Sequence, residues 1–268
     1  AHHPTRAGRS ATTHLVQLDG EPREVVCKLG GPSVYTGEVI EPLVTTMLGE
    51  RTDLPVPRVL ATGRVTPASP PNDRWALYER LPGSPATGFR ECDPSTRAEV
   101  VRTVGSVLGR LHATFQYDRP GGLTRNGDDL RIAPTSGPEV ATIGRHLSGE
   151  DAFVLAHGDL FPGNVLVDAS GSVTGVIDWA NAHVTTPTDS LARAELRFLD
   201  WFRFDPAERS MLQDALRAGY QAHRPLPDAY DAVGWLFKLL WLVQSGVWAL
   251  GHLTTGHGRR QLRRTLGR

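Results

Sequence analysis

The stretch AHGDLFPGNVLVDASGSVTGVIDW, residues 156–179, constrains the fold of this chain more than any other. Two short runs of β-branched and apolar residues, 165–167 and 173–177, flank a polar segment, a pattern typical of a β-hairpin. A hairpin returns its two ends to the same place. We therefore expect Asn164, before the first strand, and Asp178, after the second, to lie close together.

The residues before the hairpin follow the spacing H-x-D-L-x-x-x-N, formed by His157, Asp159, Leu160 and Asn164. A protein-kinase catalytic loop has a similar skeleton, with Arg in place of Gly158. The resemblance implies that Asp159 is the catalytic base and that Asn164 and Asp178 hold magnesium. In the kinase loop the histidine braces the backbone, so we expect His157 to support the loop rather than to transfer protons.

The segments HGDLFPGNVLVD and GVIDW together resemble the Brenner-type signature of the aminoglycoside phosphotransferase and choline kinase-like family. The resemblance implies an α+β, two-lobed protein-kinase-like fold. We expect a small antiparallel-sheet nucleotide-binding lobe over residues 1–81 and a mostly helical lobe over residues 82–268, which carries the catalytic loop and the substrate-binding helices. Asp189 resembles the family's D-L-A acid, and we expect it to cap the next helix and support the catalytic loop.

Lys28 is one of only two lysines, the other being Lys238, among 29 basic residues. Alternation and a turn at Asp19-Gly20 predict a strand pair over 14–18 and 24–29, with Lys28 on the second strand. By resemblance, Lys28 holds the nucleotide phosphates. The polar run before the first strand, residues 8–13, is expected to cover the phosphates through Ser10 and Thr12, although it lacks G-x-G-x-x-G and reads equally well as an ordinary polar turn.

Apolar spacing predicts a helix that begins near Glu41, because Pro42 fits only in a first turn. Glu41 is the first candidate to pair with Lys28, and Glu38 is the second. Either acid is also consistent with a solvated helix end. The resemblance further implies that the backbone from Glu79 to Leu81 meets the nucleotide base at the hinge between the lobes.

The remaining sequence predicts helices over 97–117, 191–203, 206–223 and 230–252. His112, beside the apolar stripe of the first of these helices, is expected to be a satisfied core histidine. Residues 121–148 are expected to be rich in loops, with no assigned role. The last helix is rich in Trp and Leu, but Lys238 and Gln244 interrupt it, which favours a buried helix over a membrane span.

We expect a cytoplasmic protein, monomeric or homodimeric, that binds neither nucleic acid nor membrane. Its formal net charge is zero, so no global field attracts a polyanion. Its two cysteines, Cys27 and Cys92, form no CxxC, and its first ten residues lack the apolar core of a signal peptide. The basic C-terminal segment GRRQLRRTLGR is expected to be a solvated tail.

We expect a kinase that transfers the γ-phosphoryl group of ATP or GTP, with Mg²⁺, to a hydroxyl of a small metabolite or antibiotic. From residue 190 onward the chain has seven acidic and twelve basic residues, whereas a polycationic acceptor needs a surplus of carboxylates. Glu195, Asp200 or Asp205 would have to supply them. Two alternatives remain: a nucleotide-binding regulator without catalysis, and a metal-dependent hydrolase that uses Asp159, Asp178 and His183.

Overall fold

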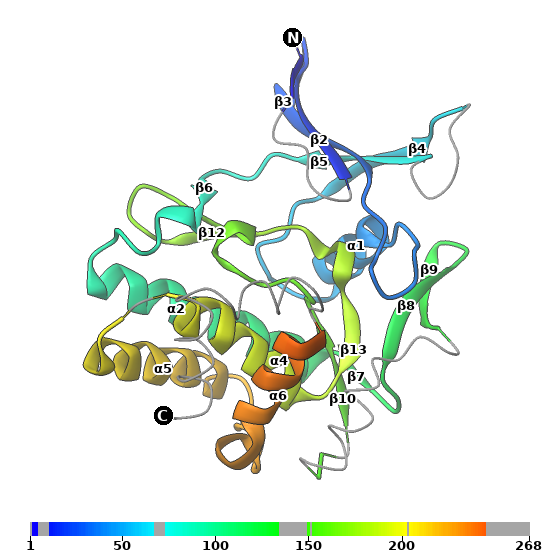
Figure 1. The fold of residues 1–268 in the computed structure, drawn as a ribbon. Helices are drawn as coiled ribbons and strands as arrows, with labels where there is room; N and C mark the ends of the chain where they lie inside the picture. The colour runs from blue at the N-terminus through cyan, green and yellow to red at the C-terminus, as the bar shows by residue number, and fades with distance from the viewer. Residues whose placement is uncertain are drawn as a thin grey trace.

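A computed structural model describes residues 2–4, 11–66, 73–133, 149–150, 152–202 and 204–244 of the 268-residue chain. Its first part is an antiparallel sheet in the order β1-β2-β3-β5-β4, seen at the top of Figure 1. The strands are β1 (His2–Pro4), β2 (Ala11–Gln17), β3 (Glu24–Gly30), β4 (Val59–Arg64) and β5 (Arg74–Glu79). The predicted strand pair is present as β2 and β3, and β3 is the central strand of the sheet.

The strand β2 begins earlier than the sequence predicted. The polar run was expected to be a loop through Thr13, but residues from Ala11 onward already pair with β3, beginning with Ala11 opposite Gly30. The ladder extends this far because β3 itself runs on to Gly30. Residues 5–10 lie outside the described part of the chain.

A single helix, α1 (Glu41–Arg51), supports the sheet from below in Figure 1. It begins at Glu41, as predicted, and Pro42 occupies its first turn, where the missing N–H costs no hydrogen bond. Ile40, Val44 and Leu48 are fully buried and join the main hydrophobic core. The helix therefore holds its first residue, Glu41, at the boundary between the sheet and the rest of the molecule.

The predicted hairpin of the larger part is formed by β11 (Val165–Val167) and β12 (Val173–Val176), and β6 (Ser84–Pro85) adds a third strand on the β11 side. A separate five-stranded sheet has the order β7-β10-β13-β8-β9. Its strands are β7 (Gln116–Tyr117), β8 (Gly121–Asn126), β9 (Asp129–Ile132), β10 (Phe153–Ala156) and β13 (His183–Thr185). The expectation of loops from residue 121 was wrong for residues 121–132, which form the β8–β9 hairpin.

The helices of the larger part are α2 (Pro94–Thr114), α4 (Pro187–Glu195), α5 (Pro206–Gln221) and α6 (Tyr230–Gln244). Short 3₁₀ turns lie at η1 (Ala86–Gly88), η2 (Pro162–Asn164) and η3 (Trp179–Asn181), and a π-helical turn, η4 (Leu196–Asp200), continues α4. The predicted helix over 191–203 instead begins at Pro187, because Thr186 provides the N-cap that we had assigned to Asp189. The lobe boundary after residue 81 stays a prediction.

The long helices α2 and α5 lie side by side (Figure 1) and approach each other closely at glycines. A Cβ added to Gly219 would lie 1.9 Å from the carbonyl oxygen of Arg102, and one added to Gly105 would lie 2.1 Å from that of Leu216. His112 of α2 is fully buried and contacts the Tyr220 hydroxyl at 2.9 Å and the Ser190 hydroxyl at 3.0 Å. Burial lowers its pKa to about 3, so it is the satisfied core histidine that we predicted.

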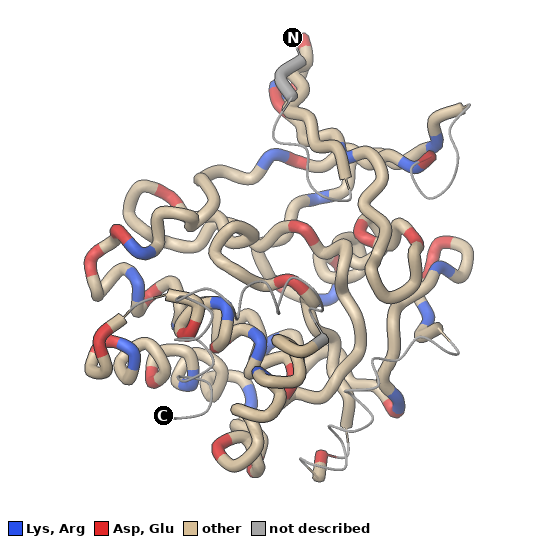
Figure 2. Tube along the Cα trace, in the orientation of Figure 1, with Lys and Arg blue, Asp and Glu red and all other residues tan. Residues whose placement is uncertain are grey.

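Charges of both signs are interspersed along the chain trace, with no lobe given over to one sign (Figure 2). Among the described helices, none is long and apolar enough to cross a bilayer.

The glycine contact between α2 and α5 predicts that Gly219→Ala destabilises the protein. A methyl group against the Arg102 carbonyl forces the two helices apart, at a cost of about 1–3 kcal/mol. Gly88→Ala is the matched control, because a Cβ there meets nothing within 4 Å. Guanidinium denaturation of the two variants measures the difference, and equal midpoints would contradict the packing argument.

Candidate active site

The loop from Ala156 to Asn164 depends on a glycine at its start. Gly158 has φ +83°, and a Cβ there would lie 1.9 Å from the carbonyl oxygen of Asn181. A side chain is excluded on both counts, because L-residues rarely adopt this conformation and the space is already filled by backbone. This explains why the chain has glycine where a protein-kinase loop has arginine.

His157 braces this loop against the end of the hairpin. Its Nε2–H donates to the carbonyl oxygen of Ile177 at 3.0 Å, and its Nδ1 accepts from the Asp159 backbone N–H at 3.3 Å. The ring stacks on Trp179, with centroids 4.3 Å apart. Burial lowers the pKa of His157, which keeps the ring neutral and able to accept on one side while it donates on the other.

Backbone and side-chain hydrogen bonds bring Asp159, Asn164 and Asp178 to one place. The Asn164 amide nitrogen donates to the carbonyl oxygen of Asp159 at 2.9 Å. The Ile177 N–H donates to the carbonyl oxygen of Asn164 at 3.0 Å, which extends the β11–β12 pairing to the residue before Asp178. The hairpin thus places the amide and the carboxylate at its open end, as its sequence indicates.

Asp178 adopts the left-handed conformation, with φ 66° and ψ 60°, the only non-glycine residue with positive φ in the described chain. Asp tolerates this conformation better than most residues, and such strain is common at functional sites. The turn directs the carboxylate to Lys28, whose Nζ lies 2.7 Å from Oδ1. Burial alone would raise the pKa of Asp178, but the charge and hydrogen bond of Lys28 lower it overall.

Lys28 also contacts Glu41 of α1, with Nζ 2.5 Å from Oε2. The side chains of Lys28 and Glu41 are only 12% and 7% exposed, so this is a buried pair. Burial alone would lower the pKa of Lys28, but Glu41 and Asp178 together raise it, and the ammonium stays charged. Glu38 lies elsewhere: it accepts hydrogen bonds from the Thr124 hydroxyl and from the Arg125 N–H of β8.

The other residues predicted to contact nucleotide are spread around β2 and the end of β5. Thr12 is an exposed residue of β2 opposite Leu29, and Ser10 lies outside the described residues. Glu79 ends β5, and Leu81 packs over Gly175 of β12, where it would meet an added Cβ at 2.7 Å. These contacts place the segment after β5 against the same hairpin that carries Asp178.

Asp189 lies in the first turn of α4 and is fully buried. Its carboxylate accepts from the Thr185 hydroxyl at 2.9 Å and from Arg193 Nε at 3.1 Å. Arg193 in turn donates to the Tyr35 hydroxyl at 3.0 Å. Asp189 therefore links α4 to the β3–α1 connection rather than capping the helix.

His183, the further ligand that a metal-dependent hydrolase would need, is buried in β13 and stacks on Tyr35, with centroids 4.2 Å apart. Within the described ranges, no group of three or more His, Cys, Asp or Glu side chains is arranged to hold a metal ion. Among these residues His183 therefore does not join Asp159 and Asp178 in such a group.

Comparison with known proteins identifies the family. The sequence matches the phosphotransferase enzyme family over residues 3–228, most of the chain. This chain belongs to the phosphotransferase enzyme family. An aminoglycoside 3'-phosphotransferase of Streptomyces fradiae is 29% identical over 198 residues, which span 65% of this chain and 69% of that protein. The uncharacterized protein YcbJ of Bacillus subtilis is 28% identical over 138 residues, 41% of this chain and 45% of its own length.

Solved structures share the protein-kinase-like fold of this phosphotransferase family member. A thermostable mutant of aminoglycoside phosphotransferase APH(4)-Ia, in a ternary complex with AMP-PNP and hygromycin B, has a TM-score of 0.62 at 15% identity, over 99% of this chain and 94% of that one. A choline kinase from Cryptosporidium parvum Iowa II has a TM-score of 0.61 at 13% identity, over 100% of this chain and 88% of that one. At these identities the likeness establishes the fold alone.

The candidate site also includes a residue that the sequence did not indicate, Arg197 of η4. Its Nη2 lies 3.3 Å from Oδ1 of Asp159. Its guanidinium carbon lies over the rings of Phe161, Trp201 and Trp241, at 4.6, 5.5 and 5.6 Å from their centroids. No helical pattern reveals this position, because the π-turn shifts the faces that a period of 3.6 residues predicts.

The buried ion pairs of this phosphotransferase predict that Lys28→Met is strongly destabilising, because it leaves the Glu41 carboxylate buried without a partner. The expected loss is about 3–5 kcal/mol in the free energy of unfolding. Adding Glu41→Gln to Lys28→Met should recover part of it, measured by guanidinium denaturation near neutral pH.

The control for this pair of variants is Arg23→Met, since Arg23 is 86% exposed and such surface changes cost within about 0.5 kcal/mol. A double variant no more stable than Lys28→Met alone would contradict the assignment of Glu41 as the partner.

Proposed function

We propose that the protein is a small-molecule kinase that transfers the γ-phosphoryl group of ATP or GTP to a hydroxyl, with Asp159 as the base. The observation that carries this proposal is the convergence of Lys28, Glu41 and Asp178 from three separate elements. A charged lysine held beside a carboxylate at the end of the catalytic hairpin is the arrangement that positions nucleotide phosphates in kinase-like folds. Membership of the phosphotransferase enzyme family supports the reaction type.

The donor set at the open end of the hairpin fits magnesium. Mg²⁺ prefers oxygen ligands and binds through one or two carboxylates together with substrate phosphates. Asn164 offers an amide oxygen, since its amide nitrogen is bound to the Asp159 carbonyl. The Asp178 side chain is 44% exposed, so it remains open to a ligand while Lys28 holds one of its oxygens. When bound, the ion neutralises charge that develops on the transferring phosphoryl group.

The chain's own groups account for the remaining steps. Lys28 binds the α- and β-phosphates, and Glu41 fixes the lysine. Asp159, 38% exposed, orients the acceptor hydroxyl and takes its proton. The acceptor oxygen forms a bond to the γ-phosphorus as the bond from that phosphorus to the β–γ bridging oxygen breaks. The products are a phosphate monoester and the nucleoside diphosphate, and the proton on Asp159 passes to solvent.

A nucleotide donor is further supported by the solved relatives, since the APH(4)-Ia structures include complexes with AMP-PNP and with ADP. In this chain we propose that the purine base of the nucleotide lies against the segment from Glu79 to Leu81. Thr12 and Ser10 lie near its phosphates. His157 supports the loop of Asp159 through its hydrogen bond to the Ile177 carbonyl. Asp189 supports the site through its ion pair with Arg193.

The proposed base predicts that Asp159→Asn lowers phosphoryl transfer by about 10²–10⁴-fold while nucleotide binding persists, because general-base catalysis contributes that much. The assay is mass-spectrometric detection of phosphorylated product from Mg-ATP or Mg-GTP and a pooled panel of aminoglycosides, macrolides, choline, homoserine, sugars and hydroxy acids.

The matched control is Asp19→Asn, an exposed aspartate in the β2–β3 connection, which should keep wild-type activity. Nucleotide binding without transfer to any acceptor would favour the non-catalytic regulator. Neither binding nor transfer would overturn the proposed function.

A further inference from the structure

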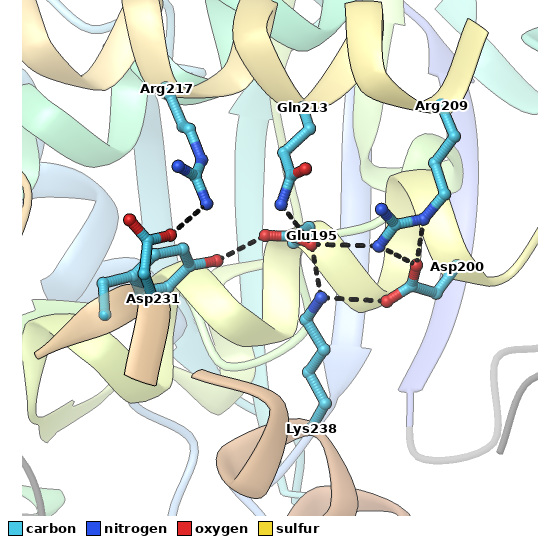
Figure 3. A network of polar contacts seen from close by, with 8 residues as sticks. Glu195, Asp200, Arg209, Gln213, Arg217, Asp231 and Lys238 are labelled. Atoms are coloured by element: carbon cyan, nitrogen blue, oxygen red, sulfur yellow. Dashed lines mark hydrogen bonds and ion pairs between the residues drawn. The ribbon is translucent and has the colours of Figure 1, made fainter. Parts of the chain in front are cut away.

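Of the three acidic side chains that a polycationic acceptor would need, Glu195 and Asp200 are neutralised inside the protein, whereas Asp205 is an exposed helix cap. Glu195 and Asp200 are 2% and 0% exposed, and both contact Lys238 of α6 and Arg209 of α5 (Figure 3). Asp200 lies 2.9 Å from the Lys238 ammonium and 2.6 Å from an Arg209 nitrogen. Asp205 caps α5 by accepting from the Glu208 N–H at 2.9 Å. All three acids therefore serve the fold.

The pocket beside Asp159 has two arginines in its lining. Its lining includes Leu160, Arg193, Ala194, Arg197 and Trp241, and Asp159 is the one carboxylate among the described residues that line it. Arg193 is neutralised by Asp189, which is buried with it. Arg197, which lies 3.3 Å from the partly exposed Asp159, is thus the cation of this lining that no buried carboxylate neutralises among the described residues.

Arg197 makes fewer polar contacts within the described chain than Arg193 of α4 and Arg209 of α5. Arg209 contacts two carboxylates, and Arg193 contacts a carboxylate and a hydroxyl. A guanidinium has five N–H donors, yet within the described chain Arg197 makes one hydrogen bond, the 3.3 Å contact to Asp159. Its side chain is 19% exposed, so most of it is removed from water without a full set of partners.

The ion network fixes the surroundings of Arg197. Lys238 and Trp241 are three residues apart on α6, so they lie on neighbouring positions of one helix face. While Lys238 is held by Glu195 and Asp200 on either side of Arg197 in the sequence, Trp241 lies over the Arg197 guanidinium. Phe161, from the catalytic loop, stacks on the same group. Arg197 is therefore a fixed cation with aromatic walls, which suits recognition of a planar anion.

We propose that the acceptor is a hydroxy acid whose carboxylate binds Arg197 while its hydroxyl meets Asp159. This inference rests on the proposed function and names its substrate class. Because Arg197 and Asp159 lie 3.3 Å apart, the hydroxyl and the carboxylate are separated by only a few bonds in the acceptor. The transfer itself is the one written above, and the carboxylate remains unchanged. An ammonium group next to the reacting hydroxyl would meet Arg197 and be repelled.

The test compares hydroxyl compounds that differ in charge. Glycerate, malate, tartrate, gluconate and glucuronate are each assayed beside their carboxamides, together with ethanolamine, choline and kanamycin, with Mg-ATP and Mg-GTP. We expect a hydroxy acid to be phosphorylated with kcat/KM at least about tenfold above its carboxamide, since an arginine–carboxylate contact is charge-assisted and bidentate.

Variants separate recognition from folding. Arg197→Gln should raise KM for the hydroxy acid and remove the preference for acid over amide, and Arg197→Lys should restore part of it. The matched control Arg102→Gln changes an arginine of α2 that is 51% exposed, and it should keep both KM and the preference. Thermal shift with Mg-AMP-PNP monitors nucleotide binding in every variant.

Some outcomes overturn the acceptor class alone. Phosphorylation of kanamycin, choline or ethanolamine in preference to every hydroxy acid would do so and leave the kinase assignment standing. Equal use of acid and amide, an Arg197→Gln variant with an unchanged preference, or nucleotide binding without use of any hydroxy acid would also overturn it. Absence of nucleotide binding in the wild type would instead overturn the proposed function.

Discussion

The buried ammonium of Lys28 is the constraint on which the site depends. Burying an ammonium costs free energy unless carboxylates lie beside it. Glu41 of α1 and Asp178, at the end of the β11–β12 hairpin, are the two carboxylates that contact Lys28. The cost of separating these charges ties the central strand of the first sheet to α1 and to the β11–β12 hairpin. The left-handed turn at Asp178 is maintained by the same contact. The requirement for a charged lysine thus fixes the geometry around it.

The second lysine of the chain has a parallel role in the helices. Lys238 is 7% exposed on its side chain and neutralises Glu195 and Asp200, which come from two consecutive turns of α4 and η4. In a chain whose other basic residues are arginines, both lysines are the compact cations of buried clusters. The first cluster fixes the proposed nucleotide side of the active site. The second holds α6 against the helix that carries Arg197, which is the proposed acceptor side.

The elements predicted well are those whose signals are local. The β11–β12 hairpin, the β2–β3 pair and the start of α1 follow from alternation, turn residues and Pro42. Glu41 lies beside Lys28, as its position at the helix start suggested.

The features that were missed depend on contacts distant in sequence or on irregular backbone. The strands of the β8–β9 hairpin show no strong apolar alternation. The N-cap of α4 is Thr186, three residues before Asp189. Arg197, which contacts Asp159, lies in a π-turn after α4 that no periodicity indicates. The roles of the predicted site residues in nucleotide and metal binding stay predictions.

Calorimetric titration of AMP-PNP tests the central claim most directly, that Lys28, Asn164 and Asp178 form a nucleotide–magnesium site. We predict binding by the wild type that requires Mg²⁺, because the hairpin oxygens act through the ion. In Asp178→Asn, with the fold verified by circular dichroism, the magnesium-dependent part of the affinity should be lost. Binding that is indifferent to magnesium, or that is unchanged in Asp178→Asn, would contradict the account.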